Sequence, residues 1–233
     1  MLRLLLLAAL LAAPADAAER SVVVTSFDRI RVDGPFDVRL TTRATPGATI
    51  AGDARALDLV SVRVDGGMLI VRADRGGWGE RGNAVSASAP VIRVQTRDLK
   101  SASVIGGGQL TVTGPVTAER VDLTVTGAGT LTTTGLAAGQ VTATLIGTGA
   151  MTLAGTARGA RLIGNGAGRI AAERLTAGDV TVRTDGTTAV GVTARFTAAA
   201  YSTGLGPIEI LGRPECKGKA QAGGPIRCGG KPL

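Results

Sequence analysis

Histidine is absent from this 233-residue chain, and only five of its residues are aromatic and two are cysteine. Without histidine the chain cannot build a Ser-His-Asp or Cys-His catalytic system. Zinc or iron held by imidazole is excluded for the same reason. Two thiols alone make a poor metal site, and the Gly-Gly-x-Gly-x-Asp repeats that bind calcium are missing. We therefore expect no metal site and no cofactor.

Glycine, in contrast, is abundant, with 35 residues or about 15% of the chain, against a usual share of about 7%. These glycines lack the strict three-residue period of collagen. Hydrophobic residues make up 44% of the sequence, which supplies enough apolar surface for a core and argues against disorder. The length allows one or two domains.

Residues 1–17 have the pattern of a secretory signal peptide. The segment has a basic start and an uncharged apolar run, and it ends in Ala15-Asp16-Ala17, which fits an Ala-x-Ala cleavage site. A membrane anchor would need about 20 apolar residues, and Pro14 interrupts this run too early. We expect cleavage between Ala17 and Ala18, which leaves residues 18–233 as the mature chain, without a transmembrane segment.

The two cysteines, Cys216 and Cys228, lie close together near the C-terminus. An even cysteine count in an exported chain favours a disulfide, whereas a redox site would prefer the spacing Cys-x-x-Cys. Closing the loop of residues 216–228 would contribute about 3 kcal/mol in the chain-entropy model. We expect this loop and the charged tail of residues 217–231 to cap one end of the fold.

Residues 21–73 alternate apolar and polar side chains in short runs between Asp-Gly and Pro-Gly turns, as expected for β-strands. Residues 74–90 break this pattern with glycine and charge, and we predict an irregular loop. This loop carries the single tryptophan, Trp78, flanked by Arg75 and Arg81. Trp78 could anchor the loop by packing on a sheet edge. Alternatively, Trp78 stacks on a ligand while Arg75 and Arg81 contact its anionic groups.

From residue 91 onward, glycine-containing corners recur at a nearly constant spacing. We place them at Gly106, Gly127, Gly147, Gly164-Asn165-Gly166, Asp185-Gly186, Gly204 and Gly223. Leucine-rich repeats would need a fixed leucine frame and an asparagine ladder, and propeller blades would need 40 or more residues. The spacing fits a parallel β-helix, in which glycine lets the backbone turn sharply at each corner and stack closely on the corner of the next coil.

The predicted fold class is therefore all-β: a single right-handed parallel β-helix, or solenoid, over residues 18–233. With coils of about 20 residues, the mature chain would make roughly ten of them, in a rod on the order of 50 Å long. A narrow interior accounts for the abundance of Ala, Val, Thr and Leu and the scarcity of aromatic residues.

Several segments also carry a resemblance to a known family. They are Phe27-Asp-Arg-Ile-Arg-Val-Asp-Gly-Pro-Phe-Asp-Val-Arg-Leu40, Val62-Arg-Val-Asp-Gly-Gly-Met-Leu-Ile-Val71, Ser202-Thr-Gly-Leu-Gly206 and Gly212-x-Pro214. Together they resemble the bacterial family called the putative auto-transporter adhesin, head GIN domain. The resemblance covers residues 22–228 and implies a secreted β-helix. It implies no catalytic residues, because the activity of that family is undefined.

We predict that the chain is not an enzyme. Polysaccharide lyases and hydrolases also use β-helices, but they need clustered carboxylates, and the acidic residues here are spread singly along the chain. This class is the least favoured alternative. Nucleic acid is not expected as a partner, although the pI is 10.7. The 22 arginines are scattered through the strands, and stacking aromatic residues are missing.

The charge balance favours an anionic partner. The net charge is +8, from 26 Lys and Arg against 18 Asp and Glu, and the arginine fork binds phosphate and carboxylate bidentately. We predict a periplasmic, secreted or cell-surface binding module for acidic polysaccharide, lipopolysaccharide or other envelope components. Charge that serves solubility alone is the competing interpretation. The alternative function is a structural or self-assembling module whose partner is another envelope protein or a second copy of the chain.

Overall fold

Alternating apolar and polar side chains make most of the chain β-strand, because every second side chain can point into one narrow interior. The structure is a computed structural model that describes residues 18–73 and 90–233. From residue 101 onward the strands are β8 (Ser101–Gly106), β9 (Gln109–Thr113), β10 (Val116–Gly127), β11 (Thr130–Gly147), β12 (Ala150–Gly166), β13 (Arg169–Gly186), β14 (Ala189–Ser202), β15 (Ile208–Gly212), β16 (Glu215–Ala220) and β17 (Ile226–Cys228).

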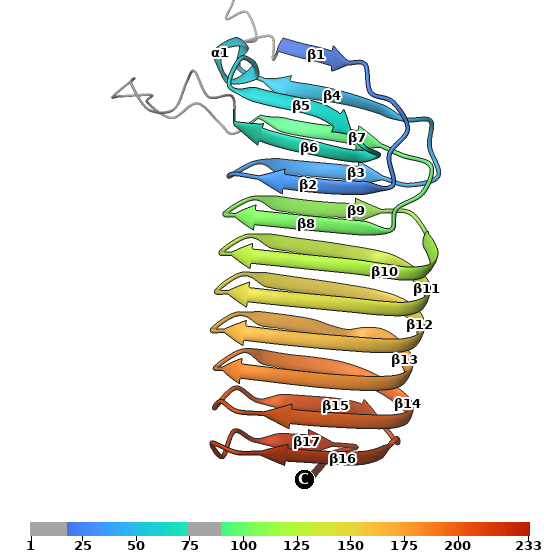
Figure 1. The fold of residues 1–233 in the computed structure, drawn as a ribbon, viewed down its shortest axis with the longest axis vertical. Helices are drawn as coiled ribbons and strands as arrows, with labels where there is room; N and C mark the ends of the chain where they lie inside the picture. Colours follow the sequence, from blue (N-terminus) through green and yellow to red (C-terminus); the bar gives the residue numbers. More distant parts are fainter. Residues whose placement is uncertain (1–17, 74–89) are drawn as a thin grey trace, which may run out of the picture.

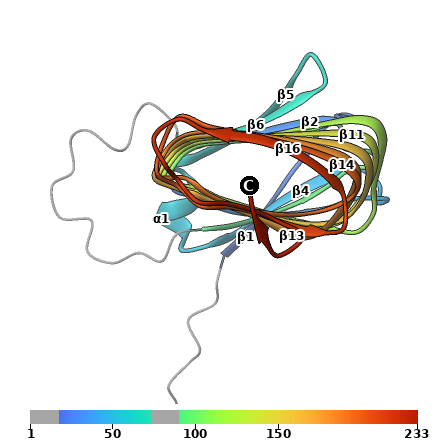
Figure 2. The same cartoon turned by 90° about the horizontal axis from the view of Figure 1, so that it is seen from below.

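These strands stack in parallel as a β-solenoid of about six turns that winds as a right-handed coil (Figure 1). Each coil contributes to two faces joined by bends (Figure 2). On the first face, Asp122, Thr142 and Arg161 follow one another in register from coil to coil. On the second face, Thr111 is in register with Thr132 in the next coil. The predicted fold class is confirmed.

Apolar side chains of successive coils stack inside the rod. Leu123, Ala143 and Leu162 occupy one such interior row, and all three are buried. Full burial of a leucine stabilises the fold by about 1.5–3 kcal/mol, so a row of this kind links each coil to the next. The two buried phenylalanines, Phe27 and Phe36, both lie near the N-terminal end.

Stacked glycines form the corner between the first and the second face. Positive φ angles recur once per coil, at Gly106, Gly127, Gly147, Gly166 and Gly186. A Cβ on Gly127 would lie 2.8 Å from the Gly106 carbonyl oxygen. Both the backbone conformation and the close approach of the coils therefore require glycine there.

The predicted corner at Gly164-Asn165-Gly166 begins too early, because the glycine that turns the chain is Gly166. Gly164 lies inside β12, where its missing side chain leaves room for buried Thr188: a Cβ on Gly164 would lie 2.5 Å from the Thr188 methyl carbon. In the preceding coil, the position equivalent to Thr188 is occupied by Gly168, and Gly168 packs against Leu145. Gly164 and Thr188 therefore compensate each other.

The N-terminal part departs from the regular coil. Its elements are β1 (Ala18–Val22), β2 (Arg29–Asp33), β3 (Asp37–Thr41), β4 (Gly47–Gly52), the short helix α1 (Ala54–Leu57), β5 (Val60–Asp65), β6 (Met68–Ala73) and β7 (Val91–Gln95). The pairs β1–β4, β4–β7 and β5–β6 are antiparallel. The predicted number of about ten coils is therefore too high, because this part of the chain builds a cap instead of further coils.

One N-terminal coil is also out of sequence order (Figure 1). Strand β2 lies between β6 and β8, and β3 lies between β7 and β9. The chain thus forms the β2–β3 coil first, leaves it to build the cap, and returns to stack β8 and β9 on its other side. The main-chain N–H of Lys100 donates to the Asp28 carbonyl at 2.7 Å, and that of Gln109 donates to the Phe36 carbonyl at the same distance.

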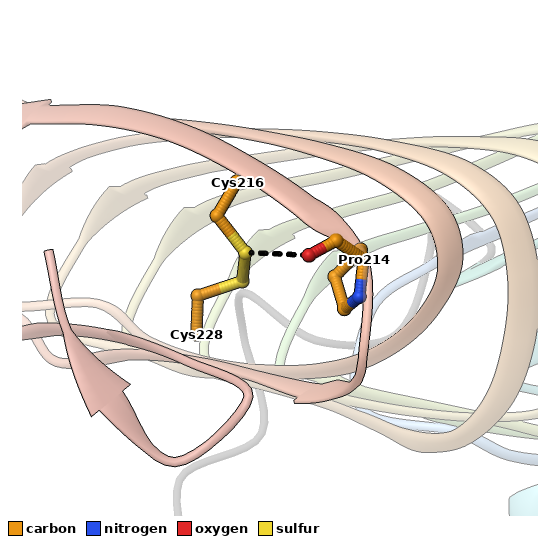
Figure 3. Close-up of a disulfide and its surroundings, with 3 residues drawn as sticks. All are labelled: Pro214, Cys216 and Cys228. Carbon is orange, nitrogen blue, oxygen red and sulfur yellow. Dashed lines mark hydrogen bonds between the residues drawn. A yellow bond between two sulfur atoms is a disulfide. The ribbon is translucent and has the colours of Figure 1, made fainter.

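The C-terminal end is closed by the predicted disulfide between Cys216 and Cys228 (Figure 3). The bond crosses the interior of the last coil from β16 on the first face to β17 on the second. The Cα atoms of the two cysteines are 6.5 Å apart, and Sγ of Cys216 lies 3.4 Å from the Pro214 carbonyl oxygen. Strand β18 (Lys231–Pro232) pairs antiparallel with β17 and covers its outer edge.

Candidate binding surface

The three predicted binding residues, Arg75, Trp78 and Arg81, all lie outside the residues that the structure describes. Their role as a ligand site therefore stays a prediction. The same holds for the signal peptide and its cleavage after Ala17, although Ala18 is the first residue of β1. The described residues offer two open grooves and one basic face as candidate surfaces.

The larger groove has a volume of about 680 Å³ and lies where the out-of-order coil meets its neighbours. Its lining includes Phe27, Asp28, Arg29 and Lys100. The Lys100 ammonium donates to the Asp28 carboxylate at 2.8 Å, and Arg29 Nε lies 3.7 Å from the same carboxylate. The charges of this groove therefore largely neutralise one another.

The Asp28–Lys100 pair shifts the protonation equilibria of both groups. The hydrogen bond from Lys100 lowers the pKa of the Asp28 carboxyl below its ordinary value of 3.8, against a smaller opposing effect of desolvation. The hydrogen bond to Asp28 raises the pKa of Lys100 in turn. Both shifts favour the ion pair at neutral pH, and the pair joins two stacked coils.

The smaller groove has a volume of about 370 Å³ and runs along the bend opposite the glycine corner. Its lining includes Glu119, Arg158 and Asp179. Arg158 donates to Glu119 two coils away, across Gly139, where a Cβ would collide with the glutamate side chain. Asp179 accepts a hydrogen bond from Thr197 at 2.6 Å. Most of the charged groups that line the two grooves therefore already have partners within the fold, whereas Arg161 of the smaller groove forms no ion pair with a described residue.

Net positive charge is concentrated in the last third of the chain. Residues 123–157 contain no charged side chain, and residues 158–233 contain eleven Lys or Arg against five Asp or Glu, a net charge of +6 out of the total +8. In the N-terminal part, by comparison, Arg20, Arg29, Arg31, Arg39 and Lys100 all pair with aspartates. The arginines are scattered along the chain as expected, but the net positive charge is not evenly distributed.

Four of these cations project from the C-terminal half of the first face. Arg183, Tyr201 and Lys219 are in register on β13, β14 and β16, and Arg161 and Lys217 belong to the neighbouring row. All five side chains are exposed, and we call them the basic face. In the described part of the chain, Lys217 pairs with Glu215 at 3.6 Å, and the other three cations form no ion pair.

The basic face was not predicted from the sequence, although a signal for it exists. Arg183, Tyr201 and Lys219 are evenly spaced in the sequence, each one coil after the last in this part of the rod. The described residues also lack any group of three or more carboxylate or cysteine side chains placed to hold a metal ion. Among those residues, no helix is long and apolar enough to cross a bilayer. The surface can therefore offer positive charge, hydroxyl groups and one exposed tyrosine.

The family model that matches this chain is the putative auto-transporter adhesin, head GIN domain, over residues 26–214. The chain belongs to this family. The resemblance read from the sequence is thereby confirmed, and the family name describes an adhesin-like binding module of the cell exterior or envelope. A comparison with curated proteins gives no match.

Several solved structures share the fold of this chain at low sequence identity. A putative adhesin from Bacteroides fragilis superimposes with a TM-score of 0.80 at 21% identity, over 88% of this chain and 94% of that one. A putative lipid binding protein from Parabacteroides distasonis gives a TM-score of 0.72 at 18% identity, over 91% and 96% of the two chains. At these identities the similarity establishes the fold and leaves the ligand open.

Proposed function

We propose that this chain is an exported, non-enzymatic binding module that attaches to anionic glycans of the bacterial envelope or its surroundings through the basic face. The proposal includes residues 1–17 as a signal peptide and a periplasmic, secreted or cell-surface location. The observation that carries it is the concentration of exposed, mostly unpaired cations on one side of a rigid solenoid.

The described side chains favour binding over catalysis. Acid–base hydrolysis of a glycan needs two carboxylates close together, and Asp28, Glu119 and Asp179 in the two grooves already accept hydrogen bonds from side chains of other coils. A row of cations on a flat sheet, in contrast, matches a ligand that presents repeated negative charges. Such binding should weaken as salt screens the charges.

Self-assembly through an apolar face, the alternative function, has less support. The large exposed apolar side chains of the described residues are Val23, Ile146, Phe196, Tyr201, Leu205, Leu211 and Leu233. They lie on different sides of the rod: Tyr201 on the first face, Leu205 at the glycine corner and Phe196 at the opposite bend. They therefore form no continuous apolar face of the kind that assembly would use.

A test compares two variants that carry the same net charge. In the first, the cations of the basic face are replaced by glutamine: Arg161→Gln, Arg183→Gln, Lys217→Gln and Lys219→Gln. In the second, four exposed cations of the first half of the chain are replaced: Arg63→Gln, Arg93→Gln, Arg97→Gln and Arg120→Gln. Retention on immobilised polygalacturonate is measured at low and at high salt, with dextran as the neutral control.

We expect the native chain and the second variant to bind polygalacturonate at low salt and to elute as salt rises, whereas the first variant flows through. Equal loss of retention in both variants would contradict a localised surface, because net charge alone would then explain the binding. A native chain that is not retained at low salt would contradict the proposed function for this class of glycan.

A further inference from the structure

Tyr201 is an exposed aromatic side chain whose surroundings leave its ring open. It is 47% exposed and lies in β14 two residues after Ala199, which shares its side of the strand, and two residues before Thr203, which follows the end of the strand. Both are small, so neither can cover a tyrosine ring. The first face therefore presents one flat, partly apolar surface among its hydroxyl and charged groups.

Phe196 provides the contrast within the same strand. Its ring lies under the Arg195 guanidinium, whose central carbon is 5.4 Å from the ring centroid, and this is the only cation–ring contact among the described residues. One edge of the Phe196 ring also lies over Gly178. Phe196, although it is 62% exposed, thus has a cation on its ring within the fold, whereas no cation of the described residues lies on the ring of Tyr201.

The two residues in register with Tyr201 are both cations. Arg183 lies one coil before it and Lys219 one coil after it, so the two backbones are separated by two strand spacings, or about 9.5 Å. Neither cation forms an ion pair with a described residue. A guanidinium and an ammonium group therefore stand on either side of an open aromatic ring, along the axis of the rod.

We infer that Arg183, Tyr201 and Lys219 form a binding site for an acidic sugar unit of a polysaccharide that lies along the rod axis. The apolar side of the sugar ring packs on Tyr201, because a tyrosine ring offers a flat apolar surface with a polar tip. The carboxylate or sulfate groups of the polymer accept hydrogen bonds from Arg183 and Lys219. This inference rests on the proposed function and gives it a location and a ligand class.

The site offers both a ring for stacking and positive charge. This combination distinguishes an acidic glycan from two other possible ligands, a lipid bilayer and a neutral glycan. A lipid bilayer would supply negative charge but no flat ring to stack on one isolated tyrosine. A neutral glycan would supply rings without groups for Arg183 and Lys219. We therefore expect the combination to favour an acidic polysaccharide over both of them.

The experiment measures the affinity of the purified full-length chain for oligogalacturonate by calorimetry at low salt. Tyr201→Ala, Arg183→Gln and Lys219→Gln test the site, and Phe196→Ala and Arg169→Gln are matched controls. Arg169 is an exposed cation of the second face that pairs with Glu173 at 3.3 Å. Thermal melts of every variant show whether the fold is intact, since all five residues are exposed.

We expect each site variant to bind about tenfold more weakly, which corresponds to the loss of one stacking or charge-assisted contact. Both controls should stay within about twofold of the native affinity. Native affinity in all three site variants would overturn the site and leave the proposed function standing. No binding by the native chain would overturn the function itself. Binding to phosphatidylglycerol vesicles without binding to oligogalacturonate would overturn the assignment to an acidic sugar.

Discussion

The N-terminal part and the regular coils both bury alternating apolar side chains, but their strands pair in different ways. In the coils from β8 onward, each strand pairs with the equivalent segment of the next coil. In the N-terminal part, antiparallel strands close the rod, and the β2–β3 coil meets its partner strand β8 only after the chain has built the cap. The comparison shows that local repetition builds the rod, whereas non-local pairing ends it.

The two parts also differ in how they use charge. Five cations of the N-terminal part pair with aspartates, such as Arg31 with Asp33 and Arg39 with Asp37. The C-terminal coils carry an excess of cations, and several of those on the first face form no ion pair with a described residue. Paired charges serve the fold, so the unpaired ones are the better candidates for contact with a partner.

The largest expected effect concerns the glycine corner, which the N-terminal cap lacks. In Gly127→Ala, the alanine would have to adopt a strained positive φ of 105°, and its Cβ would lie 2.8 Å from the Gly106 carbonyl oxygen. We expect this substitution to destabilise the fold by about 3 kcal/mol. The matched control is Gly66→Ala in the β5–β6 turn, where φ is also positive but no atom lies within 4 Å. It should cost only about 1 kcal/mol. Urea unfolding followed by circular dichroism measures both values, and equal losses would contradict close stacking as the cause.

Removal of the disulfide should open one end of the rod and leave the other unchanged. Cys216→Ser with Cys228→Ser deletes a cross-link within the last coil that contributes up to about 3 kcal/mol. Because the bond joins only the last coil across its interior, we expect faster hydrogen exchange in residues 208–228 and native exchange in residues 29–113. Uniformly faster exchange would show that the coils unfold together rather than from the end.

The Gly164–Thr188 pair offers a test inside the regular coils. Gly164→Val should collide with buried Thr188 and cost about 2 kcal/mol. Adding Thr188→Gly restores the arrangement of other coils, in which a branched residue of the strand faces a corner glycine. The double variant should therefore be more stable than Gly164→Val alone, with a coupling energy of about 1 kcal/mol or more. Additive losses in chemical denaturation would exclude the proposed compensation.

The smallest effect is expected at the junction of the out-of-order coil. The pKa of Asp28 is lowered in the folded state, so its contribution to stability is present above its ordinary pKa of 3.8 and is lost as pH falls through the folded value. Asp28→Asn should lower the Tm by about 1–3 °C at pH 7, because the ion pair is exposed. The difference should vanish near pH 2, and a constant difference across a pH series of thermal melts would argue against the ion pair.

The regular coils were predictable because their signal repeats. Corner glycines at a nearly constant spacing, with alternating strands between them, identified the fold class and the coil length. The predicted corner at Gly164 was placed two residues too early. A glycine that makes room for Thr188 cannot be distinguished in the sequence from a glycine that turns the chain. The short step from Gly147 to Gly164, followed by a long step to Gly186, was the sign of this error.

Unlike the regular coils, the N-terminal arrangement and the basic face were not predicted from the sequence. Strand β4 and the insertion of the β2–β3 coil depend on partners far along the chain, and nothing local marks them. The row of Arg183, Tyr201 and Lys219 becomes visible only once the register of β13, β14 and β16 is known. From the sequence, a binding role was predicted for Trp78, whereas Tyr201 stood out only as part of the family resemblance of the final coil.

Side-chain footprinting locates the bound ligand on the native chain, because it compares the aromatic residues within one molecule. The native chain is oxidised by hydroxyl radicals with and without oligogalacturonate at low salt, and the modified residues are identified by mass spectrometry. We expect the ligand to protect Tyr201 and to leave Phe196 and Trp78 unchanged. Protection of Trp78 with unchanged oxidation of Tyr201 would contradict this account and move the binding surface to the segment of residues 74–90.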